Sequence, residues 1–254
     1  MASLEARLGG ALFDRTAAGL TLTGLGQRVL GELEVVEGAL TRVDDAASAN
    51  EHAVEGVVRV ALTETLASLF VVPTVLPDLL RRHPKLKIDL VVGNTAADLA
   101  RREADIAVRF FLMARGDLLT RRVARLQTAV MASRALAKTL GKQPVRDWPF
   151  VSVWLPSGPV AEEAWREAAG PGEVRVSTNS FHAQVEAVRA GLGVAVLPVV
   201  LGEPLGLASL RLPPGVPGPP AIDMYLVTPR ALRKVPRVAV VFEALSASLV
   251  RFGS

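Results

Sequence analysis

Polar side chains follow the ends of several apolar runs that we predict to be strands. They are Thr63, Glu64 and Thr65 after VVRVAL, Asn94 and Thr95 after IDLVVG, Arg109 at the end of IAVR, and Asn179 and Ser180 after VRVST. In open α/β sheets, ligands bind in the crevice beyond the carboxyl ends of the strands. Unpaired N–H groups at helix starts suit a carboxylate there, and an arginine adds a cation with several donors. We therefore predict a ligand-binding site built from these eight residues.

Two features leave the nature of this site open. Thr65, Thr95 and Ser180 are also residue types favoured as ordinary helix N-caps, which explains each of them taken singly. Glu64 carries a negative charge that suits either Arg109 or a cationic ligand. The sequence therefore does not decide the charge of the ligand.

Residue patterns typical of enzymes and metal centres are missing from the sequence. It has no cysteine, no HExxH, no phosphate-binding Walker loop and no GxSxG, and GLG at residues 191–193 lacks the third glycine of a dinucleotide fingerprint. His52, His83 and His182 are isolated, which is typical of surface or packing histidines. We therefore expect no catalytic residue, no metal ligand and no cofactor, and predict that the protein is not an enzyme.

Strand-like and helical runs alternate along most of the chain, which predicts parallel or mixed sheets covered by helices. The predicted strands are residues 57–62, 87–92, 106–110, 127–132, 150–154, 174–178, 194–198 and 224–228. The predicted helices are residues 65–82, 96–103, 133–140, 160–169, 180–190 and 235–252. Residues 212–221 are a proline-rich connector. These runs form two α/β units of similar size.

The first 55 residues have a different pattern. Short runs on either side of Gly19 predict a small hairpin, and a long helix is expected from Thr23 onward. On that helix Val29, Leu33, Val36, Leu40, Val43 and Ala47 are spaced alternately four and three residues apart. Such an apolar seam packs either on its own domain or on a second copy of the helix.

Four blocks of the sequence resemble LysR-type transcriptional regulators. LEARLGGALFDRTAAGLTLTGLG at residues 4–26 is similar to the family's LExxLGxxLFxRxxxGxxLTxxG block. GVVRVAL with PTVLPDLLRRHPKLKIDLVVG, and then ADIAVR, resemble the first half of the family's effector-binding region. AVRAGLGVAVLP resembles the AVxxGxGIAxLP block of its second half.

The resemblance implies a fold and a division into domains. Residues 1–22 would be the remnant of a winged helix-turn-helix, and residues 23–55 the linker helix that dimerises. Residues 56–254 would be an α/β effector-binding domain like type 2 periplasmic binding proteins, with two subdomains. Subdomain I would hold about residues 56–126 and 229–254, and subdomain II about residues 127–228, so that the chain crosses near Leu126 and near Pro229.

The resemblance also implies a DNA-binding transcription regulator that a small-molecule effector controls and that forms a homodimer or homotetramer. Arg7, Arg15 and Thr16 are the candidate DNA contacts. In the family pattern, about 30 further residues precede the Leu4–Glu5 pair and hold the front of the helix-turn-helix, which reads the bases. With those residues restored we expect DNA as a partner. Without them, the alternative is a stand-alone small-molecule-binding or dominant-negative dimerisation protein that does not bind DNA.

Composition and charge fit a folded cytoplasmic protein. Half of the 254 residues are hydrophobic, and no apolar run is long enough to cross a bilayer, so we expect no membrane association. The net charge is +4, yet residues 1–55 carry nine acidic and four basic side chains. The positive excess therefore lies in the effector-binding region as scattered arginine pairs, which favours solvated surfaces over a nucleic-acid face.

Overall fold

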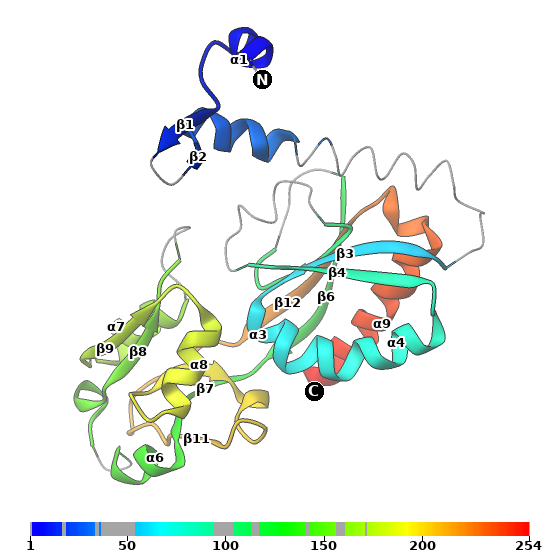
Figure 1. Ribbon diagram of the computed structural model, residues 1–254. Helices are drawn as coiled ribbons and strands as arrows, with labels where there is room; N and C mark the ends of the chain where they lie inside the picture. Colours follow the sequence, from blue (N-terminus) through cyan, green and yellow to red (C-terminus); the bar gives the residue numbers. More distant parts are fainter. Residues whose placement is uncertain are drawn as a thin grey trace. The chain divides into compact units, whose positions relative to one another are not determined.

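The chain forms two units in the computed structural model (Figure 1). The structure describes residues 2–16, 19–33, 36, 54–93, 104–112, 117–140, 143–155, 161–170 and 172–253. The N-terminal unit comprises residues 1–52 with 101–103, and the C-terminal unit comprises residues 53–100 with 104–254. Within the described residues, no helix is both long and apolar enough to span a bilayer.

The N-terminal unit contains the hairpin expected around Gly19. Helix α1 (Ala2–Leu8) precedes strands β1 (Phe13–Thr16) and β2 (Gly19–Leu22), which pair antiparallel, and residues 24–33 are helical. The Thr23 hydroxyl accepts a hydrogen bond from the Gly26 N–H at 2.9 Å, as a helix N-cap does. Gly26 is necessary there, because a Cβ would lie 2.1 Å from the Leu12 carbonyl oxygen.

The apolar seam of the following helix is only partly within the described residues. Leu33 and Val36 are exposed, at 53% and 52%, whereas Val29 is half-buried. Leu40, Val43 and Ala47 lie outside the described residues. The described part of the seam therefore presents apolar side chains on its surface.

Subdomain I is built on a mixed five-stranded sheet in the order β4-β3-β5-β12-β6. The strands are β3 (Gly56–Leu62), β4 (Leu86–Val92), β5 (Ile106–Arg109), β6 (Leu118–Leu126) and β12 (Ile222–Pro229). Strands β3, β4 and β5 are parallel, and β12 runs antiparallel to both β5 and β6. The carboxyl ends of the three parallel strands therefore meet at one edge.

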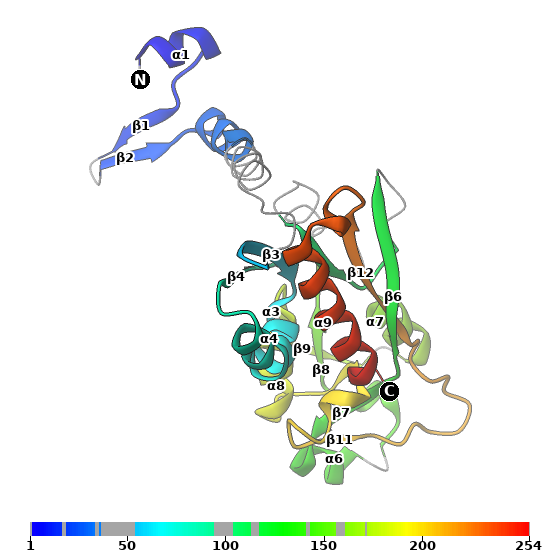
Figure 2. The same ribbon diagram turned by 90° about the vertical axis from the view of Figure 1, so that its right-hand side faces the viewer.

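Two helical segments cover one face of this sheet. The first is continuous from α3 (Glu64–Leu66) through a π-helical stretch (Ala67–Val75) to α4 (Leu76–Arg82), and the second is α9 (Pro236–Phe252), preceded by the short 3₁₀ helix Leu232–Lys234. Alternate residues of β3 and β5, such as Val58, Val60 and Val108, are buried with Phe242 and Leu245 of α9. Figure 2 shows α9 lying along this sheet.

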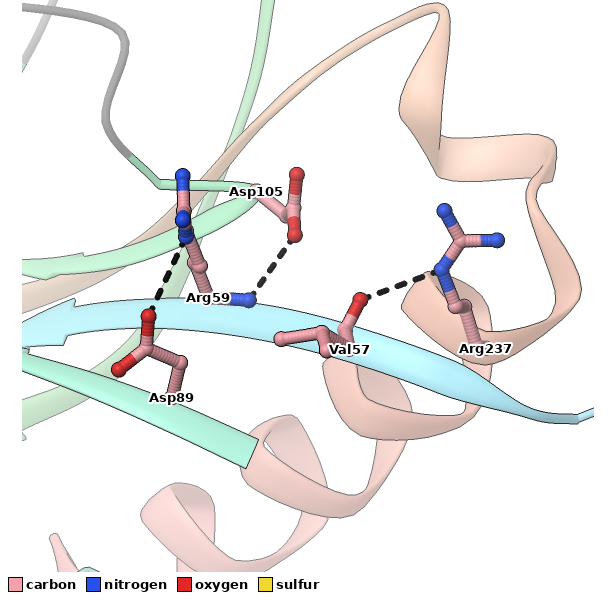
Figure 3. Close-up of polar contacts among 5 residues, drawn as sticks. All are labelled: Val57, Arg59, Asp89, Asp105 and Arg237. Atoms are coloured by element: carbon pink, nitrogen blue, oxygen red, sulfur yellow. Dashed lines mark hydrogen bonds and ion pairs between the residues drawn. The ribbon is translucent and has the colours of Figure 1, made fainter. Parts of the chain in front are cut away.

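Polar contacts tie the parallel strands together on the sheet (Figure 3). The Arg59 N–H donates to Asp105 Oδ2 at 2.9 Å, and Arg59 Nε donates to Asp89 Oδ2 at 3.2 Å, so β3 is joined to β4 and to the start of β5. At the start of α9, Arg237 Nε donates to the Val57 carbonyl at 3.2 Å. These contacts fix the strands whose carboxyl ends hold the predicted site.

Subdomain II contains two smaller groups of strands with three helices. Strands β10 (Ala195–Pro198), β7 (Thr128–Ser133) and β11 (Leu207–Ser209) form an antiparallel sheet, and β8 (Phe150–Val153) pairs in parallel with β9 (Val174–Thr178). The helices are α6 (Arg134–Leu140), α7 (Ala161–Ala169) and α8 (Phe181–Arg189), with short 3₁₀ helices at Val145–Asp147 and Val199–Leu201. Buried Trp148, Phe150 and Trp165 dominate one of its two cores.

Two side chains separate β8 from β10. The two strands begin to pair, since the Val151 N–H donates to the Val194 carbonyl at 2.8 Å. At the next step, however, the Val196 N–H donates to Glu162 Oε1 at 3.2 Å, and the Val151 carbonyl accepts from Gln184 Nε2 at 3.1 Å. Gln184 Nε2 also lies 3.0 Å from Glu162 Oε1. The side chains of Glu162 on α7 and Gln184 on α8 thus take the place of the backbone hydrogen bonds that would otherwise join β8 to β10 at this position.

The chain crosses between the subdomains at two neighbouring points. Strand β6 ends at Leu126 and β7 begins at Thr128. The expected second crossing near Pro229 is wrong, because all of β12 from Ile222 onward pairs with β6 in the subdomain I sheet. The return therefore lies just before Ile222, where the Thr128 hydroxyl donates to the Pro220 carbonyl at 2.9 Å.

The two-subdomain α/β fold predicted from the sequence is confirmed, with two differences in its elements. Strands β6 and β11 were not predicted from the sequence. The helix expected at residues 96–103 lies outside the described residues.

Candidate ligand-binding site

Helices α3 and α8 bring two of the predicted polar groups together. Residues of α3, which follows β3, lie within 8 Å of residues of α8, Cα to Cα. Thr63, Glu64 and Thr65 are at the start of α3, and Ser180 is at the start of α8. The carboxyl edge of the subdomain I strands therefore approaches the carboxyl end of β9 in subdomain II.

Thr63 and Ser180 are N-caps. Thr63 Oγ1 accepts from the Leu66 N–H at 3.4 Å, and Ser180 Oγ accepts from the Ala183 N–H at 3.2 Å. The Ser180 N–H in turn donates to Thr178 Oγ1 at 3.1 Å. Both hydroxyls thus have a local structural role and keep the hydroxyl proton for a further partner.

Thr65 and His182 hold polar atoms that have no hydrogen-bond partner among the described residues. Thr65 Oγ1 on α3 and His182 Nδ1 on α8 are both enclosed by protein atoms, and neither makes a hydrogen bond. Burying a polar atom without a partner costs free energy, so such atoms are rare in folded proteins. Their presence on the two helices that meet here marks a place where a ligand group would find partners.

Arg109 lies at the carboxyl end of β5, the central strand of the sheet. Arg109 is 2% exposed, and within the described part of the chain its Nε and Nη1 have no hydrogen-bond partner. Ala61 of β3 pairs with Ala107, so Arg109 stands level with Thr63, one strand away. Burial lowers the pKa of the Arg109 guanidinium to about 10, because removal from water disfavours its charged form.

The idea that Glu64 neutralises Arg109 is not supported. Glu64 is exposed, and no ion pair joins it to Arg109 among the described residues. Its exposure gives the physical reason, since a solvated carboxylate gains little by pairing with a buried cation.

The other predicted residues contribute less. Asn179 follows β9 and is exposed, whereas Asn94 and Thr95 lie outside the described residues. The structure therefore brings Thr63, Glu64, Thr65 and Ser180 together, and places Arg109 on the strand next to β3.

Sequence reasoning missed His182 and three exposed apolar side chains at the ends of strands. Phe111 and Leu112, 46% and 63% exposed, follow β5, and Trp154, 49% exposed, follows β8. The Trp154 N–H donates to the Thr178 carbonyl at 2.9 Å, which places it beside the chain that leads into α8. The sequence did contain a signal for these side chains, namely a large apolar residue at or directly after the end of a predicted strand.

The candidate DNA contacts belong to the N-terminal unit. Arg7 is exposed on α1. Arg15 and Thr16 lie on β1 by their backbone, and their side chains are outside the described residues.

Comparison with known proteins identifies the family. Residues 51–249 match the LysR substrate binding domain. An HTH-type transcriptional regulator of Xanthomonas campestris is 29% identical over 146 residues, which are 55% of this chain and 40% of that relative. The chain therefore spans less than half of the length of this relative.

Solved structures share the fold. CrgA, a LysR-type transcriptional regulator from Neisseria meningitidis, matches with a TM-score of 0.64 and 21% identity, over 100% of this chain and 88% of CrgA. Full-length CbnR in complex with its target DNA matches with a TM-score of 0.57 and 18% identity, over 98% of this chain and 88% of CbnR. Since the domain match covers residues 51–249 of 254, the protein belongs to the LysR-type transcriptional regulators and carries their substrate binding domain.

Proposed function

We propose that the protein regulates transcription in response to a small molecule bound where the carboxyl edges of the two subdomains meet. One observation carries this proposal: Thr65 near the start of α3, His182 near the start of α8 and Arg109 at the end of β5 hold enclosed polar atoms that have no partner among the described residues. A bound ligand would satisfy them, together with the free hydroxyl protons of Thr63 and Ser180. Ligand binding then favours one arrangement of the subdomains over another.

DNA is the second partner in this proposal. The related proteins are HTH-type transcriptional regulators, and CbnR was solved with its target DNA. We assign DNA contacts to Arg7, on the exposed surface of α1, and to Arg15 and Thr16 on β1. No described feature favours the alternative of a binding protein that acts without DNA.

A second copy of the chain is the third partner. Leu33 and Val36 expose apolar surface on the helix that follows the hairpin, and pairing two such helices would bury it. A homodimer, or a homotetramer made of two dimers, is the assembly that this surface supports.

Chromatin immunoprecipitation of the native protein tests the DNA-binding part. We expect enrichment at a few discrete sites, and altered transcription of the adjacent genes in a strain that lacks the protein. The same strain carrying Arg109→Gln should keep the enrichment but lose the change of transcription with growth conditions. Uniform, non-specific recovery of DNA together with unchanged transcription would contradict the proposal.

A further inference from the structure

We propose that the ligand of this site is an organic anion with an apolar body, and that Arg109 binds its charged group. This inference rests on the proposed function and adds the chemical class of the effector. The structure points to a carboxylate as the charged group and to an aromatic or aliphatic body beside it. Arg109 indicates this class of ligand, because its burial and its lack of partners are unusual together.

A buried guanidinium is stable only when hydrogen bonds and an opposite charge replace water. Arg109 is 2% exposed, and it forms none of the ion pairs found among the described residues, although ten other arginines do. Its Nε and Nη1 together carry three N–H groups without acceptors. An anion arriving from solution would supply acceptors and charge in one step.

The neighbours of Arg109 are already engaged and do not take the place of that anion. Tyr225, directly opposite on β12, donates its hydroxyl to Asp223 Oδ2 at 3.4 Å. Asp223 in turn lies 3.7 Å from Arg122 Nη1 on the edge strand β6. Among the described residues, Asp223 therefore forms its ion pair with Arg122 and not with Arg109.

A cationic ligand fits the described residues less well. It would have to approach the buried positive charge of Arg109, and Glu64, the carboxylate at this edge on α3, is exposed to water. An exposed carboxylate offers little binding energy, whereas a buried, unpaired guanidinium offers much. Because Arg109 is buried and Glu64 is exposed, we infer that the ligand is an anion.

Exposed apolar side chains indicate the body of the ligand. Phe111 and Leu112 come directly after Arg109 and Phe110 at the end of β5, and Trp154 directly follows β8. Large apolar side chains exposed beside a few polar groups are typical of small-molecule sites. A simple inorganic anion would leave this surface uncovered, so we infer a carboxylate with an aromatic or aliphatic part.

Isothermal titration of the full chain with matched compounds tests the inference. The probes are the acid–amide pairs benzoate and benzamide, phenylacetate and phenylacetamide, and hexanoate and hexanamide, with benzylammonium as the cation and acetate as the anion without a body. Ionic strength is held constant, because salt screens charge. We expect at least one acid to bind at least tenfold more tightly than its amide, than benzylammonium and than acetate.

Two arginine variants show whether Arg109 is responsible. Arg109→Gln should lose the preference for the acid, whereas Arg125→Gln should keep it. Arg125 is exposed on β6, so this control removes the same charge from the surface. Without ligand, Arg109→Gln should melt no lower than the wild type, because it removes an unpaired buried charge.

The inference is wrong if an amide or benzylammonium binds as tightly as the acids, if no acid binds at millimolar concentration, or if Arg109→Gln keeps the preference. If acetate bound as tightly as the larger acids, the inference that the ligand has an apolar part would be wrong. Since the acid–amide comparison uses wild-type protein, it holds even if Arg109→Gln misfolds. Any of these failures leaves site-specific DNA enrichment intact, so they are distinguishable from failure of the proposed function.

Discussion

The carboxyl group of Glu162 occupies a position beside β10 where the backbone of a neighbouring strand would normally accept a hydrogen bond. Its Oε1 accepts from the Val196 N–H, and Gln184 lies against both of its oxygens. Burial raises the pKa of Glu162 to about 7, while the hydrogen bonds from Gln184 and Val196 and the nearby Arg166 oppose that rise. The folded protein therefore holds a proton at a pH where the unfolded chain has released it.

This carboxyl predicts how stability depends on pH. Because the folded pKa lies above the unfolded value of 4.5, unfolding releases a proton, and the free energy of unfolding falls as pH rises from 4.5 to about 7. The full effect is on the order of 3 kcal/mol. In Glu162→Gln this fall should disappear, which urea denaturation at a series of pH values would measure.

Glu167→Gln is the control, since Glu167 is exposed on the same helix. It should keep the wild-type dependence on pH. Parallel curves for Glu162→Gln and the wild type between pH 4.5 and 7 would contradict the assignment.

The N-cap role was predictable from the sequence for Ser180, because a short hydroxyl side chain before a helix has an N–H within reach. At the start of α3 the cap is Thr63 and not Thr65, because the helix begins two residues earlier than a Thr65 cap requires. Whether Glu64 would pair with Arg109 was not predictable, because it depends on how deeply each side chain is buried. His182 was missed because an isolated histidine carries no spacing signal.

Among the elements, the turn between α8 and β10 depends on close backbone contact. A Cβ on Gly193 would lie 2.7 Å from the Pro149 carbonyl oxygen and 3.1 Å from Val151 Cγ2. Both neighbours belong to the segment that begins to pair with β10, so there is little room to adjust. The AGLG sequence is thus a requirement of strand pairing in subdomain II.

Gly193→Ala should therefore lower the free energy of unfolding by about 2 kcal/mol or more, through overpacking against backbone. Gly218→Ala is the matched control, because nothing lies within 4 Å of its added Cβ, and it should change stability by less than about 0.5 kcal/mol. Thermal or urea unfolding measures both. If the two variants were equally stable, the turn between α8 and β10 would have moved to accommodate the added Cβ, and the prediction would be wrong.

The elements differ in how well their patterns revealed them. Strand β6 was missed because Arg121, Arg122 and Arg125 interrupt its apolar pattern. Charged side chains are common on edge strands, where they discourage pairing with other molecules. The second crossing between the subdomains was predicted too far along the chain. The proline-rich connector before β12 has no periodic apolar pattern, so the sequence does not mark where the strand begins.

At the scale of the whole molecule, the seam of the N-terminal helix predicts assembly. Leu33→Asp should weaken self-association at least tenfold, because it places a charge on the exposed apolar seam. Sedimentation equilibrium measures the change. Glu32→Gln, at an exposed position beside the seam, should leave the association constant unaltered. A Leu33→Asp protein that assembles like the wild type would place the contact elsewhere.

The fold of the C-terminal unit was predictable because alternation of strands and helices follows directly from apolar spacing. The separation of β8 from β10 was not, because Glu162 and Gln184 come from two helices that are distant in the sequence.

The hydrogen bond between Thr128 and Pro220 has a mechanical consequence. Two chain segments held side by side resist torsion about their common direction, yet they bend together with little resistance. We therefore expect relative motion of the subdomains to be mainly an opening and closing about the paired segments. Loss of this bond in Thr128→Val would add a twisting component, so that occupancy of the site would no longer dictate a single geometry.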